Sequence, residues 1–107
     1  MSNEPLKGHL DLLVLSCLTD GPQHGYAVIE QLRSRSAGFF DLPEGTVYPV
    51  LHRLEKAGLL GSKWSTASGR RRRVYRLKRA GHKALGEQAH QWQQFARAVV
   101  AVVGAQA

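Results

Sequence analysis

The sequence predicts a small, mainly helical α+β domain in which three short helices precede a two-stranded β-hairpin and one long C-terminal helix. Two observations predict this class. Apolar residues recur with helical spacing in four segments, and a stretch of strand-like alternation separates the third segment from the fourth. The 107 residues leave room for one modest core, and 43% of them are apolar, which is enough to build it.

The first two helices are expected at residues 8–18 and 24–35. In the first helix, apolar residues recur every three or four positions and so share one face. Asp20-Gly21-Pro22 ends this helix because proline cannot continue it, and Ser36-Ala37-Gly38 ends the second. The apolar residues are Leu10, Leu13, Val14, Cys17 and Leu18 in the first helix and Ala27, Val28, Ile29 and Leu32 in the second.

The third helix is expected from about Gly45 or Thr46 to Ala57. Pro49 is tolerated only near a helix start, so the N-terminus lies close to Gly45, and Gly58 ends the helix. Its two faces differ in character. The core face carries Val47, Val50, Leu51 and Leu54, and the opposite face presents Gly45, Pro49, His52 and Lys56, flanked by Tyr48 and Arg53.

A β-hairpin follows, with strands expected at residues 60–65 and 72–77. Residues 66–69 between them are rich in turn-forming residues. The alternation places Trp64 on the same face as Leu60, so we expect Trp64 in the core. Three helices followed by a hairpin with a basic arm form the element order of a winged helix-turn-helix domain, with the hairpin as its wing.

The last helix is expected at residues 79–103. Its apolar residues are spaced 4, 3, 4, 3 and 4 apart, which is typical of a coiled-coil seam. We therefore expect a homodimer and divide the chain into a winged helix-turn-helix domain at residues 1–78 and a dimerisation helix at residues 79–107. The expected interface residues are Leu85, Ala89, Trp92, Ala96, Val99 and Val103.

The charge is distributed unevenly along the chain, whose formal net charge is +7. Residues 1–60 contain five Lys or Arg and seven Asp or Glu, whereas residues 61–107 contain ten Lys or Arg and a single Glu. A basic patch of this kind usually binds a polyanion. On charge alone, DNA, RNA and an anionic membrane surface all remain open.

Several classes of function find no support in the sequence. No apolar run approaches the roughly 18–20 residues that a membrane span needs, and no export signal is expected. The single cysteine, Cys17, suits a reducing compartment and lies on an apolar helix face, so we expect a cytoplasmic protein and a buried thiol rather than a redox sensor. The spacing of histidines and acids indicates no metal site, cofactor or catalytic residue, and hence no enzyme.

A run of motifs carries a resemblance to a known family. Residues 42–60 read LPEGTVYPVLHRLEKAGLL, which resembles the signature of PadR-type transcriptional regulators. The resemblance extends over residues 8–85. It implies a winged-helix DNA-binding domain, a C-terminal dimerisation helix and, usually, repression relieved by a small ligand, in the branch with a single helix after the wing. The supporting motifs are Asp20-Gly21-Pro22, His24-Gly25-Tyr26, Trp64, Tyr75-Arg76-Leu77 and Arg79-Ala80-Gly81.

The candidate DNA-contacting residues lie on the third helix and on the wing. The third helix would enter the major groove, where a helix fits and every base pair is distinguishable. Arginines suit phosphates and the narrow minor groove, so the wing supplies further contacts. The candidates are Thr46, Tyr48, His52, Arg53 and Lys56 on the helix, Arg70 and Arg71 at the hairpin tip, and Arg72 and Lys63 beside it.

Two further readings stay open. The resemblance implies that a planar aromatic ligand could stack on Trp92, helped by Phe95, although a tryptophan on an apolar seam is more often plain core. A winged helix could instead bind a protein partner or structured RNA through its basic wing. The run Arg70–Arg73 contains no aromatic residue, which favours DNA over RNA.

Overall fold

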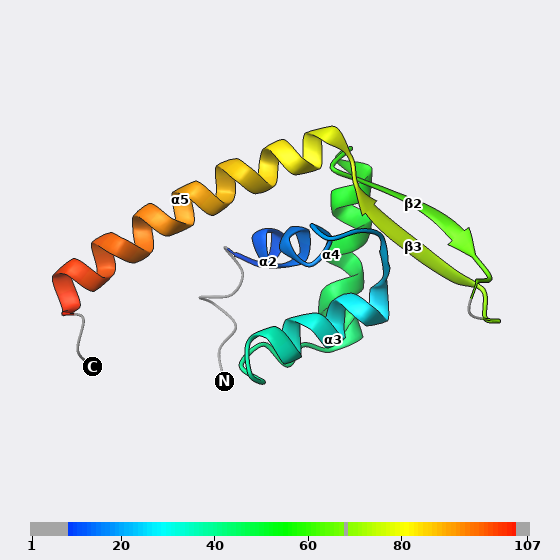
Figure 1. Ribbon diagram of the computed structural model, residues 1–107, viewed down its shortest axis with the longest axis horizontal. Coiled ribbons are helices and arrows are strands. Elements are labelled where there is room, and N and C mark those ends of the chain that lie inside the picture. The colour runs from blue at the N-terminus through cyan, green and yellow to red at the C-terminus, as the bar shows by residue number, and fades with distance from the viewer. Residues whose placement is uncertain (1–8, 68, 105–107) are drawn as a thin grey trace.

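The computed structural model describes residues 9–67 and 69–104, and its fold is the winged helix-turn-helix that the sequence predicts. Three helices form the body, a hairpin projects from one side, and a long helix extends from the other (Figure 1). The elements are α2 (Leu10–Ser16), β1 (Gln23–His24), α3 (Gly25–Arg35), α4 (Glu44–Lys56), β2 (Leu60–Ser65), β3 (Arg72–Leu77) and α5 (Arg79–Val103).

The hydrophobic core lies where α2, α3 and α4 meet the base of the hairpin. The apolar faces expected from helical spacing supply most of it, because each helix buries one stripe against the other two. Cys17 is buried as expected, and burial raises the pKa of its thiol. The buried residues are Val14, Leu15, Cys17, Leu18, Val28, Leu32, Val47, Val50, Leu51, Leu54, Leu60 and Tyr75.

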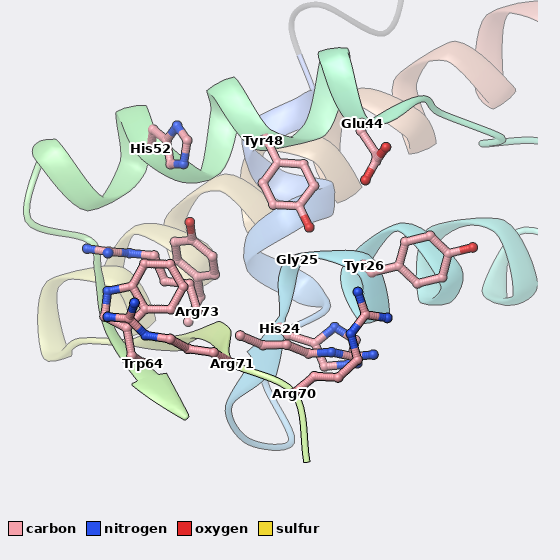
Figure 2. Close-up of a pocket in the computed structure, with 12 residues that line it drawn as sticks. His24, Gly25, Tyr26, Glu44, Tyr48, His52, Trp64, Arg70, Arg71 and Arg73 are labelled. Atoms are coloured by element: carbon pink, nitrogen blue, oxygen red, sulfur yellow. The ribbon is translucent and has the colours of Figure 1, made fainter. Parts of the chain in front are cut away.

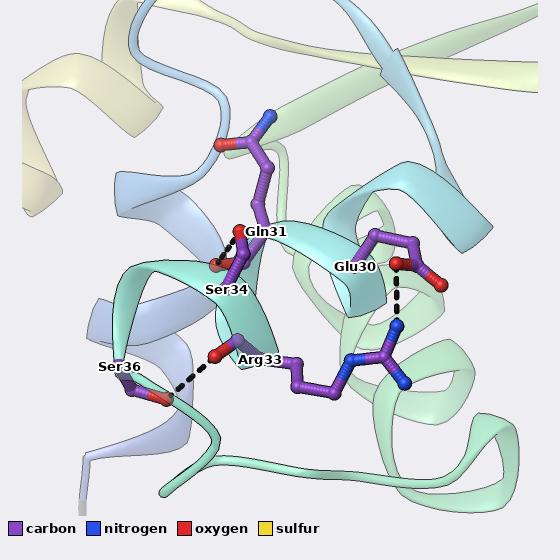
Figure 3. Close-up of polar contacts among 5 residues, drawn as sticks. All are labelled: Glu30, Gln31, Arg33, Ser34 and Ser36. Atoms are coloured by element: carbon purple, nitrogen blue, oxygen red, sulfur yellow. Dashed lines mark hydrogen bonds and ion pairs between the residues drawn. The ribbon is translucent and has the colours of Figure 1, made fainter.

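The turn between α3 and α4 begins in a cluster of polar contacts at the end of α3. Arg33 pairs with Glu30 at 2.7 Å, and Ser36 Oγ lies 3.3 Å from the Arg33 carbonyl (Figure 3). Ser36 Oγ also donates to the Leu32 carbonyl at 2.7 Å and accepts from the Phe40 N–H at 2.8 Å. One hydroxyl therefore caps the last turn of α3 and redirects the chain toward α4.

The helix α4 begins at Glu44, one residue earlier than expected, with Pro43 at its N-cap. Pro49 consequently lies in the second turn rather than the first. It has no N–H to donate to the Gly45 carbonyl, but both residues are exposed, so water can satisfy that oxygen. The proline is tolerated because it faces solvent.

The sheet has three strands rather than the two expected, in the order β1-β3-β2. The added strand is β1, whose Gln23 and His24 pair antiparallel with Tyr75 and Val74. Two residues are too short to show alternation, so the sequence carries no periodic signal for this strand. Its pairing ties the start of α3 to the wing.

The expectation that Trp64 belongs to the core is wrong. Trp64 does share a face of the hairpin with Leu60, but its side chain is 52% exposed, whereas that of Leu60 is 1% exposed. The strands β2 and β3 extend beyond the helices that cover their base (Figure 1). The same face is therefore apolar and buried near the core but open at the tip.

The helix α5 starts tightly against the body and then leaves it. Gly81 is buried, and a Cβ there would lie 2.1 Å from the Leu59 carbonyl oxygen, so only glycine allows this approach. Leu85 packs on the core, but Trp92, Val99 and Val103 are 41%, 41% and 76% exposed. No helix in the described ranges is both long and apolar enough to cross a bilayer.

Candidate nucleic-acid interface

A groove of about 500 Å³ opens between the start of α3, the outer face of α4 and the wing (Figure 2). It brings together both sets of candidates that the sequence suggested, since α4 contributes Tyr48 and His52 while the wing contributes Arg70, Arg71 and Arg72. Six further residues that the sequence analysis did not assign to the interface also have side chains lining it. They are His24, Tyr26, Glu44, Trp64, Arg73 and Tyr75.

Tyr48 is seated at the centre of this groove by a glycine on the neighbouring helix. A Cβ on Gly25 would lie 2.5 Å from Tyr48 Cε1 and 2.8 Å from Tyr48 Oη, so the ring occupies the space that a side chain would need. Burial, and then the charge of Glu44, raise the pKa of Tyr48. The phenol therefore stays protonated and can donate a hydrogen bond into the groove.

His24 connects the start of α3 to the wing. Its Nδ1 accepts a hydrogen bond from the Ala27 N–H at 3.2 Å, and its Nε2 lies 2.7 Å from Arg72 Nη1. Burial and then the positive charge of Arg72 lower the pKa of His24. A neutral imidazole whose Nδ1 accepts the Ala27 hydrogen bond carries its proton on Nε2, so His24 caps the helix, and its approach to Arg72 is a close contact between two donor groups rather than a hydrogen bond. Histidine is not among the preferred N-cap residues, so no residue preference predicts this role.

The wing is tied to α4 by a polar cluster on its inner face. Ser62 hydrogen-bonds to Glu55 of α4, and Arg73 Nε donates to Ser62 Oγ at 2.8 Å. Arg73 Nη2 also lies 3.6 Å from Glu55 Oε2. The guanidinium of Arg73 therefore makes its polar contacts within the fold, unlike those of Arg70 and Arg71.

Beyond this cluster, arginine side chains cover an exposed indole. The guanidinium carbon of Arg71 lies 4.3 Å from the centroid of the Trp64 ring, and that of Arg73 lies 5.3 Å from it. Both distances are within the range of cation–π contacts. Aromatic and basic side chains therefore interleave in space, although they do not interleave along the sequence.

Four of the sequence candidates do not line the groove. Arg53 points to the other side of α4, where its Nη1 donates to Asp11 Oδ2 at 3.1 Å and its Nη2 bonds to Asp11 Oδ1. Lys56 and Lys63 are exposed, and Thr46 is half-buried, outside the groove lining. Contact between these four residues and DNA stays a prediction.

A second cavity, of about 610 Å³, lies between α2, α4 and α5. The rings of His9 and Trp92 are 4.8 Å apart and tilted, and those of Trp92 and Phe95 are 5.9 Å apart. The Asp11–Arg53 pair forms part of its lining, so the cavity touches both the long helix and the helix of the groove. Trp92 and Phe95, three positions apart on α5, both line this cavity, and a ligand stacked on them stays a prediction.

Comparison with known proteins identifies the family. Residues 14–87 match the profile of the "Transcriptional regulator PadR-like family". The chain is 38% identical over 89 residues to the transcriptional regulator Rv3488 of Mycobacterium tuberculosis, covering 83% of this chain and 80% of that protein.

Solved structures agree with this match. A PadR family transcription regulator from Clostridium difficile superimposes with a TM-score of 0.81 at 32% identity, over 90% of this chain and 99% of that one. A PadR family transcriptional regulator from Eggerthella lenta superimposes with a TM-score of 0.80 at 33% identity, over 94% and 87%. With its fold, its motifs and its relatives in agreement, the chain belongs to the PadR-like family of transcriptional regulators.

Proposed function

We propose that this regulator is a homodimeric repressor that binds an operator through the groove between α4 and the wing. The observation that carries the proposal is the meeting of Tyr48 and His52 with the wing arginines in one groove. Within the described part of the chain, Arg70, Arg71 and Arg72 form no ion pair, so no carboxylate there neutralises their charges, which are available to phosphates.

The far half of α5 supports the homodimer. Phe95, Val99 and Val103 leave an apolar surface exposed on this part of the helix, which extends away from the described helices of the body (Figure 1). An apolar groove of about 340 Å³ between α2, α3 and α5 continues this surface toward the body. Pairing two α5 helices would cover both surfaces and hold two α4 helices at a fixed distance, which favours operator half-sites about 10 base pairs apart.

Repression would follow from binding to the operator itself, because a dimer bound there hinders RNA polymerase. No further protein surface is needed for this effect. Relief of repression would come from a planar aromatic effector in the cavity beside Trp92 and Phe95. That cavity is lined by residues of α5 and, through Arg53, of α4. A ligand there could change the spacing of the two α4 helices, but only if it binds the two arrangements with different affinity. A chromosomal repressor of this kind would act in the cytoplasm.

The RNA alternative gains one observation from the structure. Trp64, Tyr26 and Tyr48 line the same groove as the arginines, and RNA-binding surfaces often combine aromatic and basic side chains. Arginines already cover the Trp64 ring, however, so it offers less stacking surface to a base. DNA therefore remains the proposed partner.

A selection experiment tests the proposal directly. The chain is incubated at a fixed, stated salt concentration with random-sequence duplexes of about 30 base pairs, long enough for two half-sites, and bound duplexes are sequenced. We expect a pseudo-palindrome whose half-sites are about 10 base pairs apart. Enrichment from a parallel pool of structured RNA, with no duplex enriched, would overturn the proposal.

The effector is tested on the duplex recovered in this way. Planar aromatic compounds should quench tryptophan fluorescence and release the duplex, and both effects should be lost in Trp92→Phe. Quenching that persists in Trp92→Phe would place the compound elsewhere, and a broad panel without quenching would leave Trp92 as a structural residue.

A further inference from the structure

Trp64 is an exposed indole in the middle of a basic groove, at a position where its strand pattern predicts core. We propose that Trp64 is a positioning residue that holds the Arg71 guanidinium toward DNA. This inference rests on the proposed function and extends it, because it assigns different roles to Arg71 and Arg73. It also accounts for a large apolar side chain that the hydrophobic core does not use.

A continuous series of contacts runs from α4 to the hairpin tip. Glu55 of α4 contacts Ser62 and Arg73, and Arg73 lies against the Trp64 ring. Arg71 then lies 4.3 Å from the centroid of the same ring. These contacts position the Arg71 guanidinium relative to α4, the helix expected to enter the major groove. Its position does not depend on the hairpin tip alone.

The chemistry of the guanidinium explains how stacking and DNA binding are compatible. A cation–π contact uses the flat face of the group, whereas its N–H donors point outward in the plane. For Arg71, no hydrogen bond or ion pair involves these donors among the described residues. Arg71 can therefore stay on the indole and still donate to a phosphate.

Arg73 differs because its donors are already in use. Its Nε donates to Ser62, and its Nη2 faces Glu55. Arg73 thus anchors the indole, and Arg71 is the cation that the indole presents. Without the ring, Arg71 would be a long side chain at an exposed loop, and ordering it on DNA would cost more conformational entropy.

Four proteins test the inference: Trp64→Ala, Trp64→Phe, Arg71→Ala and the double variant Trp64→Ala/Arg71→Ala. Affinity is measured for the duplex recovered by selection and for a random duplex of equal length. We expect Trp64→Ala to weaken both about two- to five-fold per bound protomer, the range of an exposed cation–π contact. Trp64→Phe should restore most of the loss because it retains an aromatic face.

The double-variant cycle separates positioning from direct contact. If Trp64 acts through Arg71, the double variant binds no more weakly than Arg71→Ala. Arg71→Ala should also flatten the dependence of log affinity on log salt by roughly one per protomer, while Trp64→Ala, which keeps the charge, should change the slope less. Losses that add up, or failure of Trp64→Phe to rescue, would overturn the inference.

Two controls keep the result interpretable. Phe39→Ala removes an even more exposed aromatic ring (79%) outside the groove and should leave affinity unchanged. Thermal unfolding of each variant checks that the wing variants remain folded. Parental affinity in a folded Trp64→Ala variant would refute the positioning role alone, whereas failure of the parent to bind duplex DNA would refute the proposed function itself.

Discussion

Two arms leave the helical body in opposite directions, the β2–β3 wing and the far half of α5, and they are held in different ways (Figure 1). The wing is tied to the body by polar contacts from Ser62 and Arg73 to Glu55 of α4 and by the pairing of β3 with β1. The far half of α5 is apolar and exposed, and it has no such tether to the body among the described residues.

The two arms therefore differ in what they need from a partner. The wing is positioned by its own chain before any partner arrives, so it can meet DNA as a pre-formed surface. The apolar side chains at the far end of α5 remain exposed to solvent in the described part of the chain, so we expect a second copy of the chain to cover them.

The largest effect is expected from charge placed on the α5 seam. The double variant Val99→Asp/Val103→Asp would bury carboxylates without partners if two α5 helices pair, at a cost of several kcal/mol. The dimer should dissociate at least about 100-fold more readily. Sedimentation across a range of concentrations measures this, with Val102→Asp as the control, because Val102 lies off the seam and is 87% exposed. A double variant that stays dimeric would locate the interface elsewhere.

The base of α5 should behave as part of the core. Gly81→Ala places a Cβ where only 2.1 Å separates it from the Leu59 carbonyl oxygen. We expect a loss of about 1–3 kcal/mol in the free energy of unfolding, as for other overpacked sites. The control is Gly86→Ala on the same helix, where a Cβ meets nothing within 4 Å and helix propensity should add about 0.5–1 kcal/mol of stability. Equal urea midpoints for the two variants would contradict the tight seat of α5.

The two sides of α4 should differ in their effect on DNA binding. Tyr48→Ala removes a groove side chain and should weaken binding of the selected duplex by roughly 1–3 kcal/mol. Tyr48→Phe shows how much of that loss belongs to the hydroxyl. Arg53→Ala should cost less, because Arg53 is held by Asp11 on the far side of the helix. If Arg53→Ala is the more damaging variant, Arg53 must leave Asp11 when DNA binds.

The smallest effect concerns His24, whose ring caps α3 beside Arg72. The pKa of His24 is lowered in the fold by burial and by Arg72, so the unfolded chain takes up the proton first as pH falls. The contribution of neutral His24 to the free energy of unfolding is complete above its unfolded-state pKa of about 6.5. This contribution is lost as pH falls through the lower pKa of His24 in the fold. The control is His24→Asn, which can cap α3 but cannot titrate. Its unfolding midpoint should depend less on pH in this range, and identical pH profiles would exclude His24 as the titrating group.

From the sequence alone, the helices and the two wing strands could be predicted, but β1 could not. Helical spacing located α3, α4 and α5, and strand alternation located β2 and β3. These patterns are local, because a helix or strand that buries one face must repeat apolar residues at its own period. The basic wing and the tyrosine of α4 were recognisable for the same reason, since their element assignment follows from nearby residues.

Tertiary structure alone decided which side chains meet. Arg72 and His24 are 48 positions apart, Arg53 and Asp11 are 42 apart, and the room that Gly25 leaves for Tyr48 has no local signature. Trp64 is exposed because the wing projects past the helices. The alternation of residues within its own strand carries no information about how far the wing projects. Periodicity specifies the direction in which a side chain points, whereas the packing of distant elements decides whether it meets core, charge or solvent.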